Sequence, residues 1–253
     1  MRLEPVEQRI LGAIRFVDAT TKLRIGSPLL VKADGLSFVR NRSGHYVIAS
    51  ATGLETHTAA FDKPPVSPGL GTMLFEINVA DPASQYLARR HALKLPRDPD
   101  PKHANVGDSL FQLIDVELFP SSIAPTGPGW AVIRATVLKR GTKEPLSGSL
   151  IRVTRKNGVA AGEKALGRGL TDKRGEALVA VPGIPVTTFG EGAGSVTTNE
   201  IDVTIEAFFD PAASGIPDPD DLEERRTSLK TETIITKLAS GRTFPLTLEV
   251  TLP

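Results

Sequence analysis

The chain of 253 residues is long enough for two domains, each of which can bury a core of its own. Its hydrophobic share of 40% and charged share of 23% are typical of a folded globular protein and exclude a disordered chain. A formal net charge of +1 gives no basic surplus for nucleic acid or an anionic membrane, so we expect neither partner. The absence of cysteine excludes disulfides, thiol catalysis and thiolate metal sites.

The N-terminal segment 1–8 is charged from its start and lacks the apolar stretch of a signal peptide. No apolar run along the chain approaches the length of a membrane span, so we expect no membrane insertion. We therefore expect a cytoplasmic protein, which an assembled particle could later carry out of the cell.

Three segments along the chain alternate apolar and polar residues with a period of two. They are residues 114–118, 201–207 and 244–252. Such alternation places one side of a strand on a core and the other in water, as in the sheets of a β-sandwich. The 23 glycines and 20 prolines leave little room for long helices and favour short strands joined by turns. The segment 220–229, rich in Glu and Arg, is the one stretch expected to form a short helix.

The two halves of the sequence share matched segments, which indicates an internal duplication. The matched pairs are 21–30 with 142–151, 41–47 with 171–178, 81–84 with 210–213, and 98–100 with 218–220. Their offsets agree except for an insertion of about ten residues near 159–166 in the second copy. We therefore expect two copies of one fold, a first domain 1–124 and a second domain 125–253. The linker lies in the segment 120–129, which is dense in Ser, Pro and Gly.

The second half carries a turn motif, Gly-Leu-Thr-Asp-Lys-Arg-Gly-Glu-Ala, at residues 169–177. Thr171 and Asp172 can cap a tight turn through their side-chain oxygens, and Gly175 supplies a positive φ. With the preceding stretch 142–153, this pattern resembles the carboxypeptidase regulatory-like, transthyretin-like β-sandwich. The resemblance implies an all-β fold class, with two tandem Ig-like or transthyretin-like β-sandwich domains related by internal duplication. It says almost nothing about function, because such modules serve many roles.

Two further stretches, Ala80–Arg90 and Leu95–Pro99, bear on the biological context. Together with the two sandwiches, they make the chain similar to accessory structural proteins of phage-tail-like contractile injection systems. This resemblance implies a structural component that is assembled in the cytoplasm and whose partners are proteins of a larger assembly.

Arginines and tyrosines in the first half form a candidate docking surface, because both residue types are favoured where protein partners meet. The candidate partner-docking residues are Arg40, Arg42, Tyr46, Tyr86, Arg89, Arg90 and Arg97. The alternative is a solvated rim, or ion pairs of these arginines with Asp98 and Asp100. We expect the contact with the partner to use sheet edges and two long loops, 64–71 and 189–198.

No motif in the sequence points to a catalytic, cofactor or metal site. The histidines are His45, His57, His91 and His103. They lack the spacing of metal ligands and are expected to be scattered, at the surface or half-buried. The acidic stretch 218–221 with Asp210 could supply oxygens to Ca²⁺, but a proline between acidic residues more often forms a solvated turn. The glycines of 190–194 lack the ending of a phosphate loop, and no serine lies in a nucleophile elbow.

We therefore expect a non-enzymatic structural or docking protein without cofactors, which binds a larger protein assembly of the contractile, phage-tail-like kind. The alternative is a carbohydrate- or Ca-dependent extracellular binding module. Aromatic residues are only 5% of the chain, which counts against a carbohydrate platform, and Trp130 is expected to pack in a core or between domains. A third class, an enzyme with an unfamiliar site, would require a pocket that holds titratable groups with shifted pKa values.

Overall fold

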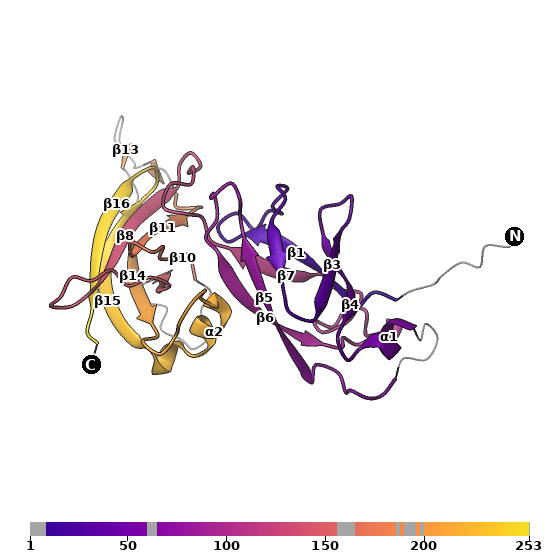
Figure 1. Ribbon diagram of the computed structural model, residues 1–253. Coiled ribbons are helices and arrows are strands. Elements are labelled where there is room, and N and C mark those ends of the chain that lie inside the picture. Colours follow the sequence, from indigo (N-terminus) through magenta and orange to yellow (C-terminus); the bar gives the residue numbers. More distant parts are fainter. Residues whose placement is uncertain are drawn as a thin grey trace, which may run out of the picture. The chain divides into compact units, whose positions relative to one another are not determined.

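The computed structural model describes residues 9–59, 65–155, 165–185, 188–189, 196–197 and 200–252. The structure is nearly all-β, which confirms the expected fold class (Figure 1). It divides into two compact units. The first unit consists of Met1–Val17, Leu23–Pro82 and Arg90–Glu117, and the second of Asp18–Lys22, Ala83–Arg89 and Leu118–Pro253. The expected domain boundary between residues 124 and 125 stays a prediction.

The first unit is a sandwich of two sheets, with strand orders β3-β4-β1-β7 and β2-β5-β6. Its strands are β1 (Gly12–Asp18), β2 (Leu30–Lys32), β3 (Leu36–Arg40), β4 (Tyr46–Ala51), β5 (Met73–Ala80), β6 (Arg89–Leu95) and β7 (Ile114–Leu118). Helix α1 (Glu55–Ala59) follows β4, and the 3₁₀ helix η1 (Pro101–His103) follows β6.

Alternating residues of the facing strands fill the core of the first unit. On β5, Phe75, Ile77 and Val79 are buried, and the residues between them are more exposed. In the other sheet, Ile14 on β1 and Ile48 on β4 are fully buried. Each such side chain contributes about 2 kcal/mol of favourable transfer from water.

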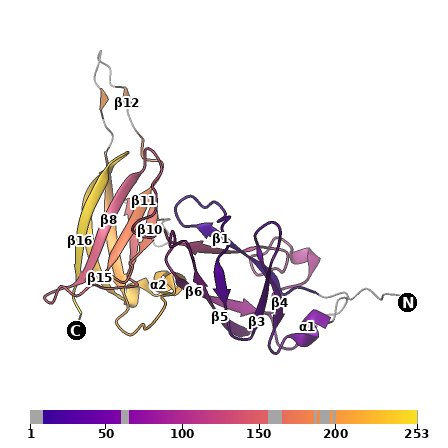
Figure 2. The same cartoon turned by 45° about the horizontal axis from the view of Figure 1, so that its top comes forward.

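The second unit is also built on two sheets, with strand orders β10-β9-β14-β15 and β11-β8-β16. Their strands are β8 (Ala131–Lys139), β9 (Leu150–Arg155), β10 (Gly167–Leu170), β11 (Glu176–Val181), β14 (Glu200–Phe209), β15 (Lys230–Ala239) and β16 (Thr243–Val250). A two-residue strand pair, β12 (Thr188–Phe189) with β13 (Val196–Thr197), forms a separate hairpin. Helix α2 (Pro219–Glu224) and the 3₁₀ helix η2 (Arg226–Ser228) lie between β14 and β15. In Figure 2, β8 lies between β11 and β16.

The two units share one strand order, with a single difference. Taken in sequence order, β1 corresponds to β8, β4 to β11 and β7 to β16, so β4-β1-β7 repeats as β11-β8-β16. Likewise β2-β5-β6 repeats as β9-β14-β15. The difference is an edge strand, because β3 pairs with β4 whereas its counterpart β10 pairs with β9. This shared order supports the internal duplication that the matched sequence segments indicate.

The turn before β11 has the geometry that its residues predict. The Thr171 hydroxyl accepts a hydrogen bond from Ser149 N at 2.8 Å and donates to Leu146 O at 2.7 Å. Asp172 Oδ1 accepts from the backbone nitrogens of Arg174 and Glu176, at 2.8 and 3.0 Å. Gly175 has a φ of 73°. The cap by Asp172 and the positive φ of Gly175 are thereby confirmed, whereas the Thr171 hydroxyl bonds the loop before β9 and does not cap this turn.

The three alternating segments appear as strands β7, β14 and β16, and the expected short helix as α2 with η2. The expectation of a single helical stretch is wrong, because α1 and η1 are also helical and are too short to leave a periodic pattern in the sequence. Trp130 packs against the cluster of Val132, Leu178 and Ala180, which confirms its packing role. Several expectations fall outside the described residues: the N-terminal segment 1–8, the glycines of 190–194, and most of the insertion near 159–166.

Candidate functional site

A cavity of about 110 Å³ lies in the first unit. Its wall is mostly apolar, with the aliphatic residues Ile10, Leu11, Leu70 and Leu110 and three prolines. Three nitrogen-bearing side chains complete it: Arg9, His57 and Arg97. These residues come from the segment before β1, helix α1, the α1–β5 loop and the segment between β6 and β7. The cavity is therefore formed only when the whole unit folds.

Helix α1 places His57 on the cavity wall. Leu54, which is fully buried, precedes the helix, and its carbonyl oxygen accepts hydrogen bonds from His57 N at 3.0 Å and Thr58 N at 3.3 Å. At the helix start, Glu55 Oε1 accepts a hydrogen bond from Gly53 N at 3.0 Å. The Thr58 hydroxyl donates to Glu55 O at 2.8 Å. These bonds hold a short helix that would be unstable in isolation.

The imidazole of His57 is the least satisfied polar group of the cavity. His57 is only 5% exposed, and neither ring nitrogen has a hydrogen-bond partner in the part of the chain that the structure describes. Burial lowers the pKa of His57 below its ordinary value, because the charged form loses hydration. The ring is therefore neutral at neutral pH, with one nitrogen as a donor and the other as an acceptor.

Arg97 is fixed by backbone carbonyl groups of the loop that precedes β7. Its Nε donates to Ser109 O at 3.0 Å, and its Nη2 donates to the carbonyl oxygens of Ser109 at 2.6 Å, Gly107 at 2.8 Å and Gln112 at 3.3 Å. Burial lowers the pKa of Arg97, and the charge of Asp108 opposes that shift. The guanidinium is thus held in one orientation at the cavity wall.

Gly12 makes room for the Arg97 side chain at the start of β1. Its φ of 153° lies in a region that residues with a side chain rarely adopt. A Cβ at this position would lie 3.3 Å from Arg97 Cδ. Leu11 N donates to Ile48 O at 2.9 Å, and Arg9 N donates to Thr58 O at 3.1 Å, so this segment is anchored to β4 and α1.

Exposed apolar side chains surround the cavity. Ile10 and Leu70 line it and are 42% and 53% exposed. Val66 and Phe111, each next in sequence to a lining residue, are 93% and 55% exposed. Exposed apolar side chains beside a cavity are a feature of interaction sites.

An enzyme would need reacting groups beside His57, the histidine whose pKa is lowered. The described lining residues include one titratable group in the neutral range, His57, and no carboxylate, hydroxyl or amine side chain. The arrangement can donate and accept hydrogen bonds and can attract an anion. It does not pair a nucleophile with a base.

Two of the predicted docking residues are buried, which corrects their assignment. Tyr46 is 7% exposed, and its hydroxyl accepts a hydrogen bond from Leu29 N at 2.7 Å and donates to Leu29 O at 3.0 Å. Arg89 is fully buried and pairs with Asp218 and Asp220. Both side chains hold the protein's own backbone or side chains, so a partner cannot reach them.

The other predicted docking residues differ in exposure and in their contacts, and their docking role stays a prediction. Tyr86 is half-buried, with its hydroxyl 3.1 Å from Asp18 Oδ2, and Arg90 pairs with Glu76 at 3.3 Å. Arg40 is exposed and donates to Gly26 O at 2.8 Å, and Arg42 is exposed in the β3–β4 turn. Of the seven, Arg97 lines the cavity in the described part of the chain.

The expected pairing of these arginines with Asp98 and Asp100 is not what the structure shows. Asp98 Oδ2 lies 2.7 Å from His103 Nδ1, and this contact raises the pKa of His103. Asp100 accepts a hydrogen bond from Lys102 N at 2.9 Å and caps η1. Both carboxylates therefore serve the local fold.

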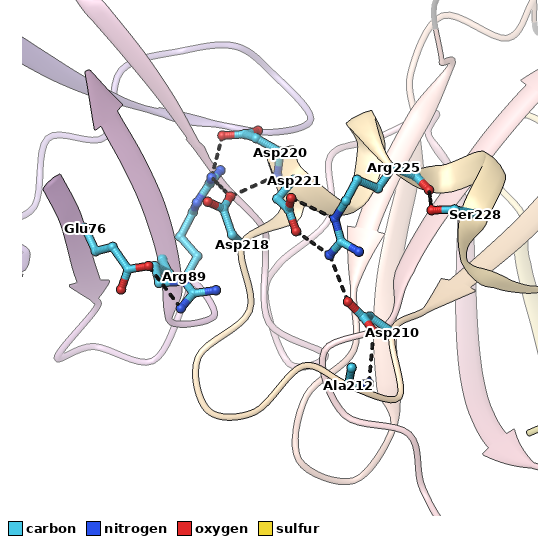
Figure 3. Close-up of polar contacts among 10 residues, drawn as sticks. Glu76, Arg89, Asp210, Ala212, Asp218, Asp220, Asp221, Arg225 and Ser228 are labelled. Atoms are coloured by element: carbon cyan, nitrogen blue, oxygen red, sulfur yellow. Dashed lines mark hydrogen bonds and ion pairs between the residues drawn. The ribbon is translucent and has the colours of Figure 1, made fainter. Parts of the chain in front are cut away.

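The acidic residues around α2 are neutralised by arginines (Figure 3). Arg89 Nη2 lies 3.2 Å from Asp218 Oδ1 and 2.5 Å from Asp220 Oδ2. Arg225 bridges Asp221 at 2.5 Å and Asp210 at 2.8 Å. The Arg225 hydrogen bond lowers the pKa of Asp210. With guanidinium groups as counter-ions, these carboxylates do not need a Ca²⁺ ion, and no group of potential metal ligands occurs among the described residues.

Comparisons with known proteins do not assign the chain to a family. No protein-family model matches the sequence, and no curated protein matches it. Three solved structures show a remote likeness. The TIE protein of Bacillus anthracis is 11% identical over 96% of this chain and 34% of its own, with a TM-score of 0.29. BcpA, the major pilin subunit of Bacillus cereus, is 12% identical over 97% of this chain and 60% of its own, with a TM-score of 0.28.

The third likeness is to (S)-allantoin synthase, 15% identical over 50% of this chain and 43% of that one, with a TM-score of 0.22. The chain thus spans about a third of the first of these proteins, 60% of the second and 43% of the third. TM-scores this low carry no argument about function. In the described part of the chain, no helix is long and apolar enough to cross a membrane.

The sequence analysis named Arg97 as a candidate docking residue, which stays a prediction, and did not single out His57 as a site residue. His57 was expected among scattered surface or half-buried histidines, and it is buried. The sequence around it, Glu-Thr-His-Thr-Ala, gives no periodic signal of burial, because α1 is only 5 residues long. The one available signal was the proline density of 64–68 and 95–101, which marks irregular segments that can enclose a cavity.

Proposed function

We propose that this chain is a non-enzymatic docking protein that binds a larger protein assembly through its first unit. The observation that carries this proposal is the apolar cavity with its exposed apolar rim. Protein interfaces place their strongest contacts where a side chain of one partner enters a pocket of the other. The cavity and rim provide such a pocket on a folded scaffold.

The distribution of exposed apolar side chains supports a role for the first unit. Of the twelve large hydrophobic side chains that are exposed in the described part of the chain, nine belong to the first unit. The charged clusters of the second unit are instead satisfied internally, as in the Arg89 and Arg225 networks. A partner gains more from covering apolar surface than from competing with ion pairs that are already formed.

The kind of assembly follows from the sequence resemblance to accessory proteins of contractile injection systems. One stretch that carries this resemblance, Leu95–Pro99, supplies Pro96, Arg97 and Pro99 to the cavity wall. The proposal is therefore a docking component of a phage-tail-like contractile particle, with the cavity face as its contact surface.

Affinity purification of the tagged chain from its native host, followed by quantitative mass spectrometry, tests this function. The proposal predicts recovery of sheath, tube or baseplate proteins in a fixed ratio to the chain. A chain that is recovered alone and monomeric would refute the docking role, and recovery in a fixed ratio with an unrelated assembly would refute the contractile particle.

A further inference from the structure

His57 is placed where a ligand would satisfy it. A side chain that is 5% exposed normally has partners for its polar atoms, because an unpaired buried donor or acceptor is costly. Neither ring nitrogen has such a partner in the described part of the chain, and the ring lines the cavity. The neutral imidazole therefore offers one free N–H donor and one free acceptor to whatever enters.

The charge of the wall specifies the polar part of that ligand. Arg9 and Arg97 line the cavity together with His57, and no acidic residue does so in the described chain. Among the described residues, the hydrogen bonds of Arg97 use its Nε and Nη2. A guanidinium group and an imidazole N–H that line the same cavity are donors of the kind that a carboxylate accepts.

The volume of the cavity specifies the apolar part. A dry cavity of about 150 Å³ holds a benzene molecule. The volume here, about 110 Å³, is smaller and suits an isopropyl or isobutyl group, which is the end of a valine or leucine side chain. Ile10, Leu11, Leu70 and Leu110 supply the aliphatic contacts.

We propose that the cavity binds a valine- or leucine-sized side chain of a partner protein together with an adjacent carboxylate, which His57 and Arg97 hold. The carboxylate is that of a neighbouring acidic residue or of a chain end. This inference rests on the proposed function and identifies the chemistry of the partner's contact. Each property of the ligand matches one feature of the cavity. The size of its side chain matches the volume, its apolar character matches the aliphatic residues, and its negative charge matches the nitrogen-bearing side chains.

Three small probes separate these features on the full chain. N-acetylleucine carries the isobutyl group and a carboxylate, N-acetylleucinamide lacks the charge, and N-acetylglycine lacks the side chain. In titrations followed by two-dimensional NMR, N-acetylleucine is expected to shift the backbone amides of Leu11, His57 and Leu110. The other two probes are expected to bind about tenfold more weakly, because each loses one class of contact.

Variants of His57 test its part in recognition. His57→Leu removes both hydrogen-bonding atoms and is expected to weaken N-acetylleucine binding about tenfold. His57→Gln keeps a donor and an acceptor and is expected to retain most of the binding. His45→Leu makes the same chemical change in the β3–β4 turn and serves as the matched control, with binding unchanged.

Two results would overturn the inference. Equal binding of N-acetylleucine and N-acetylleucinamide would show that the cavity does not recognise a carboxylate. Absence of binding by all three probes would show that it does not take a side chain of this size. Both results come from the wild-type chain, so they stand even where a variant fails to fold.

Purification from the host separates this inference from the proposed function. If the assembly is recovered with the wild type and not with His57→Leu, the docking role and the inference about the cavity are both supported. If His57→Leu recovers the assembly as well as the wild type does, the inference fails and the docking role stands. If the wild type is recovered alone, the docking role fails, and the probe titration still decides the chemistry of the cavity.

Discussion

His57 is a single residue whose buried position lowers the stability of the folded chain. A buried imidazole without hydrogen-bond partners costs about 1–3 kcal/mol relative to an apolar side chain of similar size. Leu54, which precedes α1, and Thr58 on α1 are by contrast engaged in packing or hydrogen bonds. Stability alone would favour leucine at this position, which agrees with the ligand contact that we propose for the histidine.

We expect His57→Leu to raise the free energy of unfolding of the first unit by about 1 kcal/mol, because it removes an unsatisfied polar group from a buried site. Hydrogen exchange of the buried amides of β1 and β4 measures this free energy unit by unit. His45→Leu, at a half-buried turn position, should change it by less than about 0.5 kcal/mol. A loss of stability in His57→Leu would mean that the ring has partners in the folded chain.

The pH dependence of stability gives a second test of the same residue. Burial lowers the folded pKa of His57 below 6.5, so the unfolded state takes up a proton first as the pH falls. The free energy of unfolding of the wild type should therefore fall below pH 6.5, until the pH reaches the folded pKa. The gap between His57→Leu and the wild type should widen over this range.

The contact with Asp98 raises the pKa of His103 and has the opposite effect, but His103 is present in both chains and cancels in the difference. A gap that stays constant between pH 7.5 and 5 would contradict the buried, neutral state of His57.

At the scale of elements, ion pairs far apart in sequence hold irregular segments to the sheets. Arg89, at the start of β6, reaches Asp218 and Asp220 at the start of α2, and all three belong to the second unit. Arg89 is fully buried, the Asp218 side chain is 7% exposed and the Asp220 side chain is 48% exposed. Removal of Arg89 would leave a buried carboxylate without its counter-ion.

We expect Arg89→Met to destabilise the second unit by about 3–5 kcal/mol, the cost of breaking a buried ion pair from one side. Trp130, the one tryptophan of the sequence, lies in the second unit and reports its unfolding by fluorescence in urea. The control variant Lys237→Met removes an exposed pair with Glu200 in the same unit and should change stability by less than about 1 kcal/mol. Equal effects of the two variants would refute the buried role of Arg89.

The turn at Gly175 has two requirements, a positive φ and close backbone packing. A Cβ at Gly175 would lie 2.6 Å from Val137 O, whereas Gly183, with a φ of 79°, has no atom within 4 Å of that position. We expect Gly175→Ala to cost about 3 kcal/mol and Gly183→Ala about 1 kcal/mol, because only the first adds a steric clash to the backbone strain. Urea unfolding followed by Trp130 fluorescence measures the loss of stability in both variants. Equal losses of stability would mean that the strand next to Gly175 moves freely.

At the scale of the whole molecule, the sequence predicted the repeated sandwich because its signals are local. The alternation in 201–207 and 244–252 and the turn glycines lie within a few residues of the structure they specify. The turn before β11 also follows local rules, because Asp172 caps it and Gly175 supplies the positive φ. The switch of the edge strand, with β3 on β4 but β10 on β9, depends on long-range pairing and has no local signal.

The cavity could not be predicted from the sequence either, because it also depends on long-range packing that has no local signal. Its wall combines residues from Arg9 to Leu110, and nothing in the spacing of His57 and Arg97 brings them together. The docking set chosen from composition therefore included Tyr46 and Arg89, which are buried. Composition identifies residue types that favour interfaces, whereas burial decides which of them a partner can reach.

The central claim is that the cavity face of the first unit contacts the partner assembly. Leu70, at the cavity, and Ile235, on β15 of the second unit, are similarly exposed at 53% and 58%. The most direct measurement is therefore the amount of partner recovered from the native host with tagged wild type, Leu70→Ser and Ile235→Ser. If the cavity face docks, Leu70→Ser lowers recovery about tenfold or more and Ile235→Ser leaves it unchanged. Undiminished recovery with Leu70→Ser would contradict docking through this face.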